Sequence, residues 1–322
     1  MKNITLVSTS SRENEEASML NKPQLNVFVS VIIPVFNDSD RLKLCLQALE
    51  NQTYSKDLYE VIVVDNASQE DIKSVVSQFS QAKFAYESQP GSYAARNQGI
   101  SIAKGEILAF TDSDCIPALD WVEKGVENLL STPNCGLVAG RIDLFFKNPD
   151  QPTAVELYES IAMDFPQERS LKKDHYGVTA NLFTFKHVID SVGRFDDTLK
   201  SGGDLEWGQR VFAAGYKQVY ADDACVAHPS RHSYSQLYKR VARIVGGRYD
   251  RMMSRNPSSM EVAIDLVETF KPPFRSLYGI WTNEKLYGVQ QKFQFNLVML
   301  FIRYVTILEK LRLYLGGQSK RE

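Results

Sequence analysis

The sequence predicts an α/β fold in which helices flank a mostly parallel sheet, with a helical extension at the C-terminus. Between residues 27 and 142, short apolar runs rich in β-branched side chains alternate with segments of helical spacing, which is typical of βαβ units. From Ser233 onward the patterns are helical. With 322 residues, 43% of them hydrophobic, the chain can bury a large core.

The first elements form a βαβ unit. The run VFVSVIIPVFN, which begins at Val27, predicts a strand buried on both faces, and Pro34 is expected to end it. A helix follows an Asp/Ser cap, and YEVIVVDNAS predicts a second buried strand. The apolar positions of the helix are Leu42, Cys45, Leu46 and Leu49.

The alternation then continues. We expect helices at Asp71–Phe79, Ser92–Ala103 and Leu119–Leu130, and strands at Phe84–Glu87, Ile107–Thr111 and Gly136–Ile142. The pattern becomes less regular after residue 142, and the stretch from SGGDLEWGQR to CVAHP predicts a helix, a glycine stop and a strand. In such Rossmann-like sheets ligands bind beyond the carboxyl ends of the strands, where Asn37, Asp65 and Asp112 stand.

Two different helical patterns follow. A basic helix over Ser233–Arg255, by default a solvated face, has arginines suited to a diphosphate or to anionic lipid heads. Later an apolar stripe comprises Leu297, Leu300, Phe301, Tyr304, Leu308, Leu311 and Leu315. Charged residues interrupt the stripe, so we expect no membrane span. Core packing, an oligomer contact and a helix lying on a bilayer surface stay open.

Charge, cysteines and the N-terminus limit the functional classes. Lysine plus arginine number 37 against 39 aspartates and glutamates, and a formal charge of −2 gives no field that would recruit nucleic acid. The four cysteines form no C-x-x-C pair, which fits a reducing cytoplasm better than a zinc knuckle or a disulfide framework. Residues 1–25 are polar, lack the apolar stretch of a signal peptide, and are expected to be a flexible tail.

Asp112 and Asp114 follow the apolar run ILAFT one residue apart. Acidic residues after a strand are often turn formers or helix caps, so D-x-D alone is weak evidence. At the carboxyl end of a parallel strand the pair also suits a hard divalent cation that keeps positions for water and phosphate oxygens. Alternation along an extended backbone is expected to point both carboxylates to one side, with Ser113 turned away.

Three further stretches carry candidate side chains. PGSYAARNQG matches neither the dinucleotide fingerprint nor the P-loop, which disfavours a dehydrogenase and a P-loop kinase. Its Arg96 suits either a surface ion pair or a phosphate. Asp204 and Glu206, near a predicted helix start, favour either an interaction with the helix dipole or a general base. His228 alone is more typical of a structural histidine.

Taken together, these residues resemble the nucleotide-sugar glycosyltransferases of family 2, which are inverting enzymes with the GT-A fold. The family pattern P-x-[FY]-N appears as VSVIIPVFN, V-[VI]-D-[DN]-x-S as VIVVDNAS, G-x-x-x-A-R-N-x-G as GSYAARNQG, and D-x-D as TDSDC. The four motifs stand in the family order between Val27 and Cys115, and a looser resemblance extends to CVAHP. One departure is that Gly203 precedes Asp204, where the family commonly has Glu-Asp.

The resemblance implies a nucleotide pocket. Pro34, Phe36 and Asn37 would line it. Asp65 would recognise the base, and Arg96 would lie near the base and the phosphates.

The resemblance also implies a metal site and a base. Asp112 would contact the ribose or a metal-bound water, Asp114 would bind Mn²⁺ or Mg²⁺, and His228 would complete the metal site. Asp204 aligns with the general base.

The expected organisation is a tail over 1–25, a GT-A domain over 26–232, and a helical region over 233–322 for acceptor, membrane-surface or oligomer contacts. The expected reaction is metal-assisted transfer of a sugar from a nucleotide-diphosphate donor, UDP favoured, to a hydroxyl of a saccharide or lipid-linked acceptor. The protein would be cytoplasmic, with peripheral membrane contact or homo-oligomerisation as further options.

Three alternatives stay open. A glycoside hydrolase also uses two carboxylates, but it needs no nucleotide pocket. A nucleotidyltransferase would form or hydrolyse the diphosphate itself. A degenerate sugar-nucleotide-binding protein is favoured only by Gly203.

Overall fold

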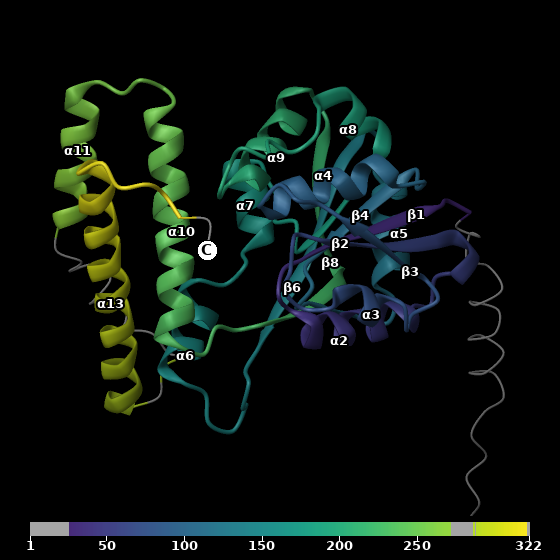
Figure 1. Cartoon of the computed structure of the whole chain (residues 1–322), viewed down its shortest axis with the longest axis horizontal. Helices are drawn as coiled ribbons and strands as arrows, with labels where there is room; N and C mark the ends of the chain where they lie inside the picture. The colour runs from purple at the N-terminus through teal and green to yellow at the C-terminus, as the bar shows by residue number, and fades with distance from the viewer. Residues whose placement is uncertain (1–25, 272–285, 287, 321–322) are drawn as a thin grey trace, which may run out of the picture.

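The computed structural model describes residues 26–271, 286 and 288–320. An eight-stranded sheet, ordered β3-β2-β1-β4-β7-β6-β8-β5, carries helices on both faces, and a group of further helices lies beside it (Figure 1). The predicted α/β class is thus confirmed. The tail expected at 1–25 lies outside the described residues.

Four parallel strands form one half of the sheet. They are β1 (Val29–Val35), β2 (Tyr59–Asp65), β3 (Ala82–Tyr86) and β4 (Ile107–Thr111). β1 and β2 are buried along their whole length, as their continuous apolar sequences predict. The prediction that Pro34 ends β1 is wrong, because Pro34 lies inside the strand opposite Val64. On the β1 side, the pairing with β4 covers only residues 29–32. It therefore ends before Pro34, whose missing N–H leaves no gap in that ladder.

The other half of the sheet is mixed. It contains β5 (Ile116–Pro117), β6 (Cys135–Phe145), β7 (Asn181–Phe185) and β8 (Lys217–Pro229). β7 runs antiparallel to β4, and Thr111 pairs with Asn181. The residues just before β7 therefore lie at the same edge of the sheet as the residues just after β4. β8 runs parallel to β6 and brings His228 opposite Leu144, near the carboxyl end of β6.

Two apolar cores lie on the two faces of the sheet. One face is covered by α2 (Ser39–Glu50), α3 (Ile72–Val76) and α5 (Trp121–Ser131), and the opposite face by α4 (Ser92–Ile102), α7 (Gln167–Asp174), α8 (Lys186–Val192) and α9 (Gly203–Ala213). The short helix η1 (Lys56–Leu58) leads into β2. The four predicted apolar positions of α2 are all buried. Helical spacing thus identified the face of α2 that packs on the sheet.

A third core joins the remaining helices, α6 (Ala154–Ala162), α10 (Tyr234–Met253) and α13 (Gly288–Tyr314), and α11 (Ser259–Phe270) packs against α13. α6 precedes the boundary expected at residue 232, so the helical group includes a segment inserted between strands of the sheet. Among the described residues, no helix is both long and apolar enough to cross a membrane.

The apolar stripe predicted near the C-terminus faces outward. Only Phe301 of the stripe packs against the third core, so core packing is the wrong interpretation for the other six side chains. The exposed members are Leu297, Leu300, Tyr304, Leu308, Leu311 and Leu315. A different face of α13, with Val298, Val305 and Leu313, is buried. α11 adds the exposed side chains of Met260, Ile264, Val267 and Phe270.

Candidate active site

The D-x-D carboxylates lie in a turn after β4 and face different partners. The Cys115 N–H donates to the Asp112 carbonyl at 3.1 Å, so the backbone turns here instead of staying extended. Asp112 accepts from the Arg96 guanidinium at 2.5 Å. Asp114 faces the Nε2 atom of His228 at 3.7 Å. The expectation that both carboxylates share one side fails because alternation applies only to extended backbone.

Arg96, on α4, is the buried cation of the site. Its side chain is 4% exposed, and its one carboxylate partner in the described part of the chain is Asp112. The Nε atom is buried and has no hydrogen-bond partner among the described residues. An unpaired buried donor costs about 1–3 kcal/mol, so a ligand that accepts from it is favoured. This guanidinium suits a phosphate or a base carbonyl.

Asp114 and His228 form a donor pair that fits a divalent cation. The Nδ1 atom of His228 lies 2.8 Å from the Pro229 carbonyl, which only accepts, so Nδ1 carries a proton and Nε2 is the ring nitrogen left to bind a metal. A carboxylate oxygen with an imidazole nitrogen suits Mn²⁺, and less strongly Mg²⁺. The Cys115 thiol is also close, but burial raises its pKa well above the usual range, and a protonated thiol is a poor ligand.

Asp204 lies at the first turn of α9, whose N-terminus favours a negative charge. Its Oδ1 accepts from the Thr179 hydroxyl at 2.9 Å, and Thr179 comes from the residues just before β7. Burial raises the pKa of Asp204, while the charge of Arg96, the Thr179 hydrogen bond and the charge of Arg243 partly offset this rise. A carboxylate with a raised pKa is a stronger base, which suits proton abstraction from a hydroxyl.

Gly203 is required by the packing of Tyr93 against the start of α9. The Gly203 N–H donates to the Tyr93 hydroxyl at 2.9 Å. A Cβ atom at position 203 would lie 2.7 Å from carbons of the Tyr93 ring, closer than van der Waals contact allows. The buried Tyr93 thus fills the space that a glutamate side chain would need. The departure from the family pattern is therefore matched by a second residue and leaves Asp204 in place.

The residues expected around the nucleotide lie at the ends of β1 and β2. Pro34 is buried in β1, whereas Phe36, just beyond the strand, is 44% exposed. The Asn37 side chain accepts from the Gln69 N–H at 2.7 Å, and Asp65 accepts from the Ser68 N–H at 3.0 Å. Asn37 and Asp65 therefore hold the loop after β2 against the end of β1. Phe36 presents a free aromatic face next to this loop.

Sequence reasoning missed several residues around the carboxylates. Arg41 binds Asp38 at 2.6 Å and Asp114 at 3.2 Å. Burial raises the pKa of Asp38, Arg41 lowers it, and the Asp114 charge raises it further. Thr179 and Tyr93 were missed too, because no motif links them to Asp204 along the chain. The only available signal was that the sequence around residues 176–185 is polar and aromatic ahead of a strand.

The chain is similar to several known proteins. The family model "Glycosyl transferase family 2" matches residues 30–193. The chain is 40% identical to "Glycosyltransferase AglE" of Haloferax volcanii over 256 residues, which cover 76% of this chain and 83% of that protein. It is 22% identical to the Methanococcus voltae protein named "Dolichyl N-acetyl-alpha-D-glucosaminyl phosphate 3-beta-D-2,3-diacetamido-2,3-dideoxy-beta-D-glucuronosyltransferase", over 66% of this chain and 70% of that protein.

A solved structure shows the same fold. It is the mannosyltransferase PcManGT of Pyrobaculum calidifontis in complex with GDP-Man and Mn²⁺, with a TM-score of 0.59 and 17% identity over 94% of each chain. At this identity the similarity shows a common GT-A-like fold.

Proposed function

Because this chain belongs to glycosyltransferase family 2, we propose that it transfers a sugar from a nucleoside diphosphate donor, UDP favoured, to a hydroxyl of a lipid-linked or saccharide acceptor, with inversion at the anomeric carbon. The observation that carries the proposal is the position of Asp204. It is a half-buried carboxylate with a raised pKa, held by Thr179 at the same strand edge as Asp112, Asp114 and Arg96.

In the proposed reaction Asp204 removes the proton of the acceptor hydroxyl as its oxygen attacks the anomeric carbon. The bond from that carbon to the diphosphate oxygen breaks on the opposite side, so one displacement inverts the centre. Arg96 donates hydrogen bonds to the nucleoside diphosphate, and Phe36 stacks on the base. Holding donor and acceptor together removes translational freedom from the reaction, which is a large part of the barrier.

Asp114 and His228 would hold Mn²⁺ or Mg²⁺, whose positive charge, when bound, offsets the negative charge that develops on the leaving diphosphate. The Mn²⁺ in the similar solved structure supports a divalent metal as cofactor here.

The test measures nucleotide release across a panel of nucleotide sugars with Mn²⁺ and with Mg²⁺. We expect UDP or another nucleoside diphosphate as product. Pyrophosphate would instead indicate a nucleotidyltransferase. Asp204→Asn should abolish transfer and leave donor affinity almost unchanged. The matched control is Glu206→Gln, half a turn along the same helix, where the carboxylate pairs with Arg210 at 2.6 Å. Retained transfer in Asp204→Asn would refute the base assignment, and binding without turnover in the unaltered protein would leave only a binding function.

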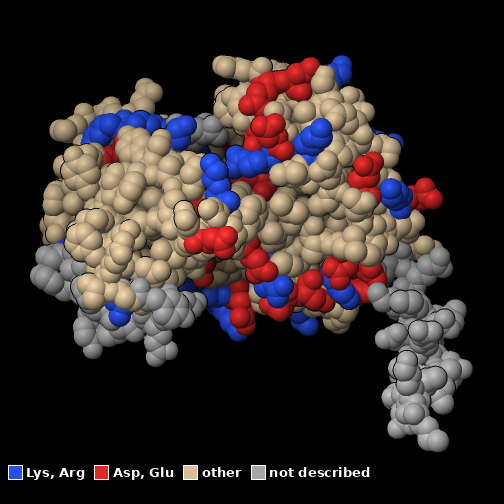
Figure 2. All heavy atoms as spheres, turned by 90° about the horizontal axis from the view of Figure 1, so that it is seen from below, with Lys and Arg blue, Asp and Glu red and all other residues tan. Residues whose placement is uncertain are grey.

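The acceptor side of the proposal includes a lipid surface. The outer faces of α11 and α13 present two rows of large apolar side chains, from Met260 to Phe270 and from Leu297 to Leu315. Figure 2, which views the helical group from below, shows few charged side chains on its described part apart from Lys and Arg along one border, and most acidic residues over the sheet. Apolar faces of this kind, with cations at the margin, suit helices lying in a bilayer interface. The acceptor in the name of the Methanococcus voltae relative is dolichyl-linked, which supports a lipid-linked acceptor here.

Flotation of the full chain with anionic liposomes tests this contact. Leu300→Gln with Leu308→Gln should reduce binding, because both side chains are about half exposed on α13. Leu44→Gln, at a comparably exposed leucine on α2, is the matched control and should bind normally. Equal flotation of all three proteins would contradict the lipid contact. A dimer in light scattering that the double variant abolishes would assign the face to contact between copies instead.

A further inference from the structure

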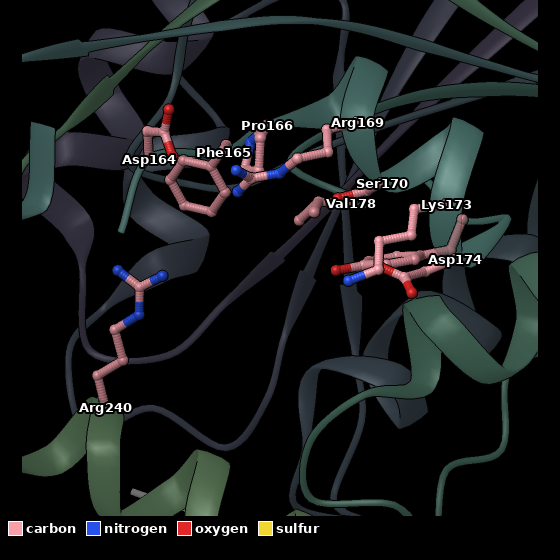
Figure 3. A pocket seen from close by; sticks show the side chains of 10 residues that line it. Asp164, Phe165, Pro166, Arg169, Ser170, Lys173, Asp174, Val178 and Arg240 are labelled. Atoms are coloured by element: carbon pink, nitrogen blue, oxygen red, sulfur yellow. The ribbon is translucent and has the colours of Figure 1, made fainter. Parts of the chain in front are cut away.

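A cavity of about 400 Å³ lies between α7, the segment before it, and α10. Arg169 and Lys173 border it from α7, and Arg240 extends into it from α10 toward Phe165 (Figure 3). The site residues described above do not line this cavity, so the donor has no need of it.

The cavity cations are poorly compensated by the protein. Arg169 and Lys173 stand one helical turn apart, where like charges destabilise a helix. Neither forms an ion pair in the described part of the chain, although Asp164 and Asp174 also border the cavity. An anion between the two cations would turn this repulsion into attraction.

Arg240 carries an excess charge in a buried position. Its side chain is 13% exposed, and it shares one carboxylate, Glu159, with Arg231. Two guanidinium groups on one carboxylate leave one positive charge uncompensated. Burial and the charge of Arg231 lower the pKa of Arg240 to about 10, because both destabilise the protonated guanidinium. The Nε atom of Arg240 has no hydrogen-bond partner among the described residues, so it offers a donor to a ligand.

The cavity adjoins the reacting groups. The Arg240 guanidinium carbon lies 5.7 Å from the centroid of the Phe165 ring. The centroids of the Phe165 and His228 rings are 4.8 Å apart. Val178, which also borders the cavity, precedes the Thr179 that binds Asp204. One residue thus separates the cavity from His228, and one separates it from the Thr179 that binds Asp204, so a molecule seated in the cavity can extend toward the candidate metal pair and the candidate base.

We propose that this cavity binds a phosphate or diphosphate group of the acceptor, with Arg240 at its inner wall and Arg169 and Lys173 at its rim. The proposal rests on the transferase function proposed above and names the acceptor class, a phosphate-bearing sugar carrier. Such a carrier is either lipid-linked or soluble, and the experiment distinguishes the two.

The experiment measures binding by titration calorimetry to the full chain saturated with UDP and Mn²⁺, which blocks the donor site. Two matched pairs of probes are compared, farnesyl phosphate with farnesol and glucose 1-phosphate with glucose. The test variant is Arg169→Gln with Lys173→Gln, because both side chains are exposed and their loss leaves the fold intact. The control is Lys172→Gln, a neighbour on the same helix that pairs with Glu168 instead of facing the cavity.

We expect the phosphate-bearing member of at least one pair to bind about tenfold more tightly than its neutral partner, since charge-assisted contacts supply that difference. The double variant should lose this preference and Lys172→Gln should keep it. A preference confined to the farnesyl pair assigns a lipid-linked carrier, and one confined to the glucose pair assigns a soluble one. No preference in the unaltered protein, or a preference that persists in the double variant, overturns the proposal. Failure of nucleotide release in the separate transfer assay would refute the transferase mechanism without altering this binding result.

Discussion

Replacing Thr179 with valine should move the pH dependence of turnover. Thr179 is 2% exposed, and its hydroxyl donates to Asp204 at 2.9 Å, so valine keeps the shape and removes only the hydrogen bond. That bond stabilises the ionised carboxylate, and its loss raises the pKa of Asp204 further above its usual range. Because the ionised carboxylate is the proposed base, the acidic limb of the kcat profile should move to higher pH.

The size of the effect follows from the strength of the bond. A hydrogen bond to a charged group contributes about 1.5–3 kcal/mol and about 1.4 kcal/mol is a factor of ten, so kcat on the acidic limb should fall about tenfold to a hundredfold. On the alkaline plateau, where Asp204 is ionised in both proteins, kcat should be nearly equal.

The assay is nucleotide release at saturating donor and acceptor over a pH series, with Thr179→Ser as the control that retains the hydroxyl. The serine variant should follow the unaltered profile. If kcat of Thr179→Val falls by the same factor at every pH, Thr179 acts through structure alone. Coincident acidic limbs for the valine and serine variants would refute a role for the hydrogen bond.

Four further changes probe the rest of the site. Gly203→Ala should lower the free energy of unfolding by about 1–3 kcal/mol, measured in urea, because its Cβ would overlap the Tyr93 ring. Tyr93→Phe, which keeps the ring, should also cost about 1–3 kcal/mol, because the buried Gly203 N–H loses its acceptor, and should lower kcat because that N–H helps to position the start of α9. Asp112→Ala should destabilise the chain by about 1–3 kcal/mol, because it leaves the buried Arg96 without its carboxylate, and added UDP should recover part of the loss in thermal melts. His228→Gln should raise the Mn²⁺ concentration needed for half-maximal rate by more than about tenfold, whereas unchanged metal dependence would remove His228 from the metal site.

The sheet was predictable because each strand is specified locally. β1, β2 and β4 are buried on both faces, so their sequences are continuous runs of β-branched and apolar residues, and the motifs follow at their carboxyl ends. The directions in which the Asp112 and Asp114 side chains point, in the turn after β4, were not predictable. Two carboxylates two residues apart point to the same side of the chain only where the backbone is extended. Here the hydrogen bond from the Cys115 N–H to the Asp112 carbonyl closes a turn instead.

Periodicity also left one choice open in α13. A stripe at helical spacing shows that a helix has an apolar face, but α13 has apolar residues on more than one face. The face with Val298, Val305 and Leu313 packs against α6 and α10, and the face with Leu300 and Leu308 stays outside. Only the partner helices decide between them. For the same reason Thr179 and Tyr93 escaped prediction, because β7 and α4 bring them to Asp204 from distant parts of the sequence.

The candidate site extends beyond the end of the sheet at residue 229, because arginines of α10 act on Asp204 and on the segment before it. Arg251 donates to the Ser201 carbonyl at 2.6 Å, just before the glycines that lead into Asp204, and the charge of Arg243 lowers the pKa of Asp204 against its burial. A chain ending at 232 would lose both arginines as well as Arg240. Asp204 would then face one cation fewer, and the segment that positions it would lose an anchor. We therefore propose that residues 26–232 form the sheet domain apart from α6, which packs with the helical group, and that the smallest active chain extends at least through α10.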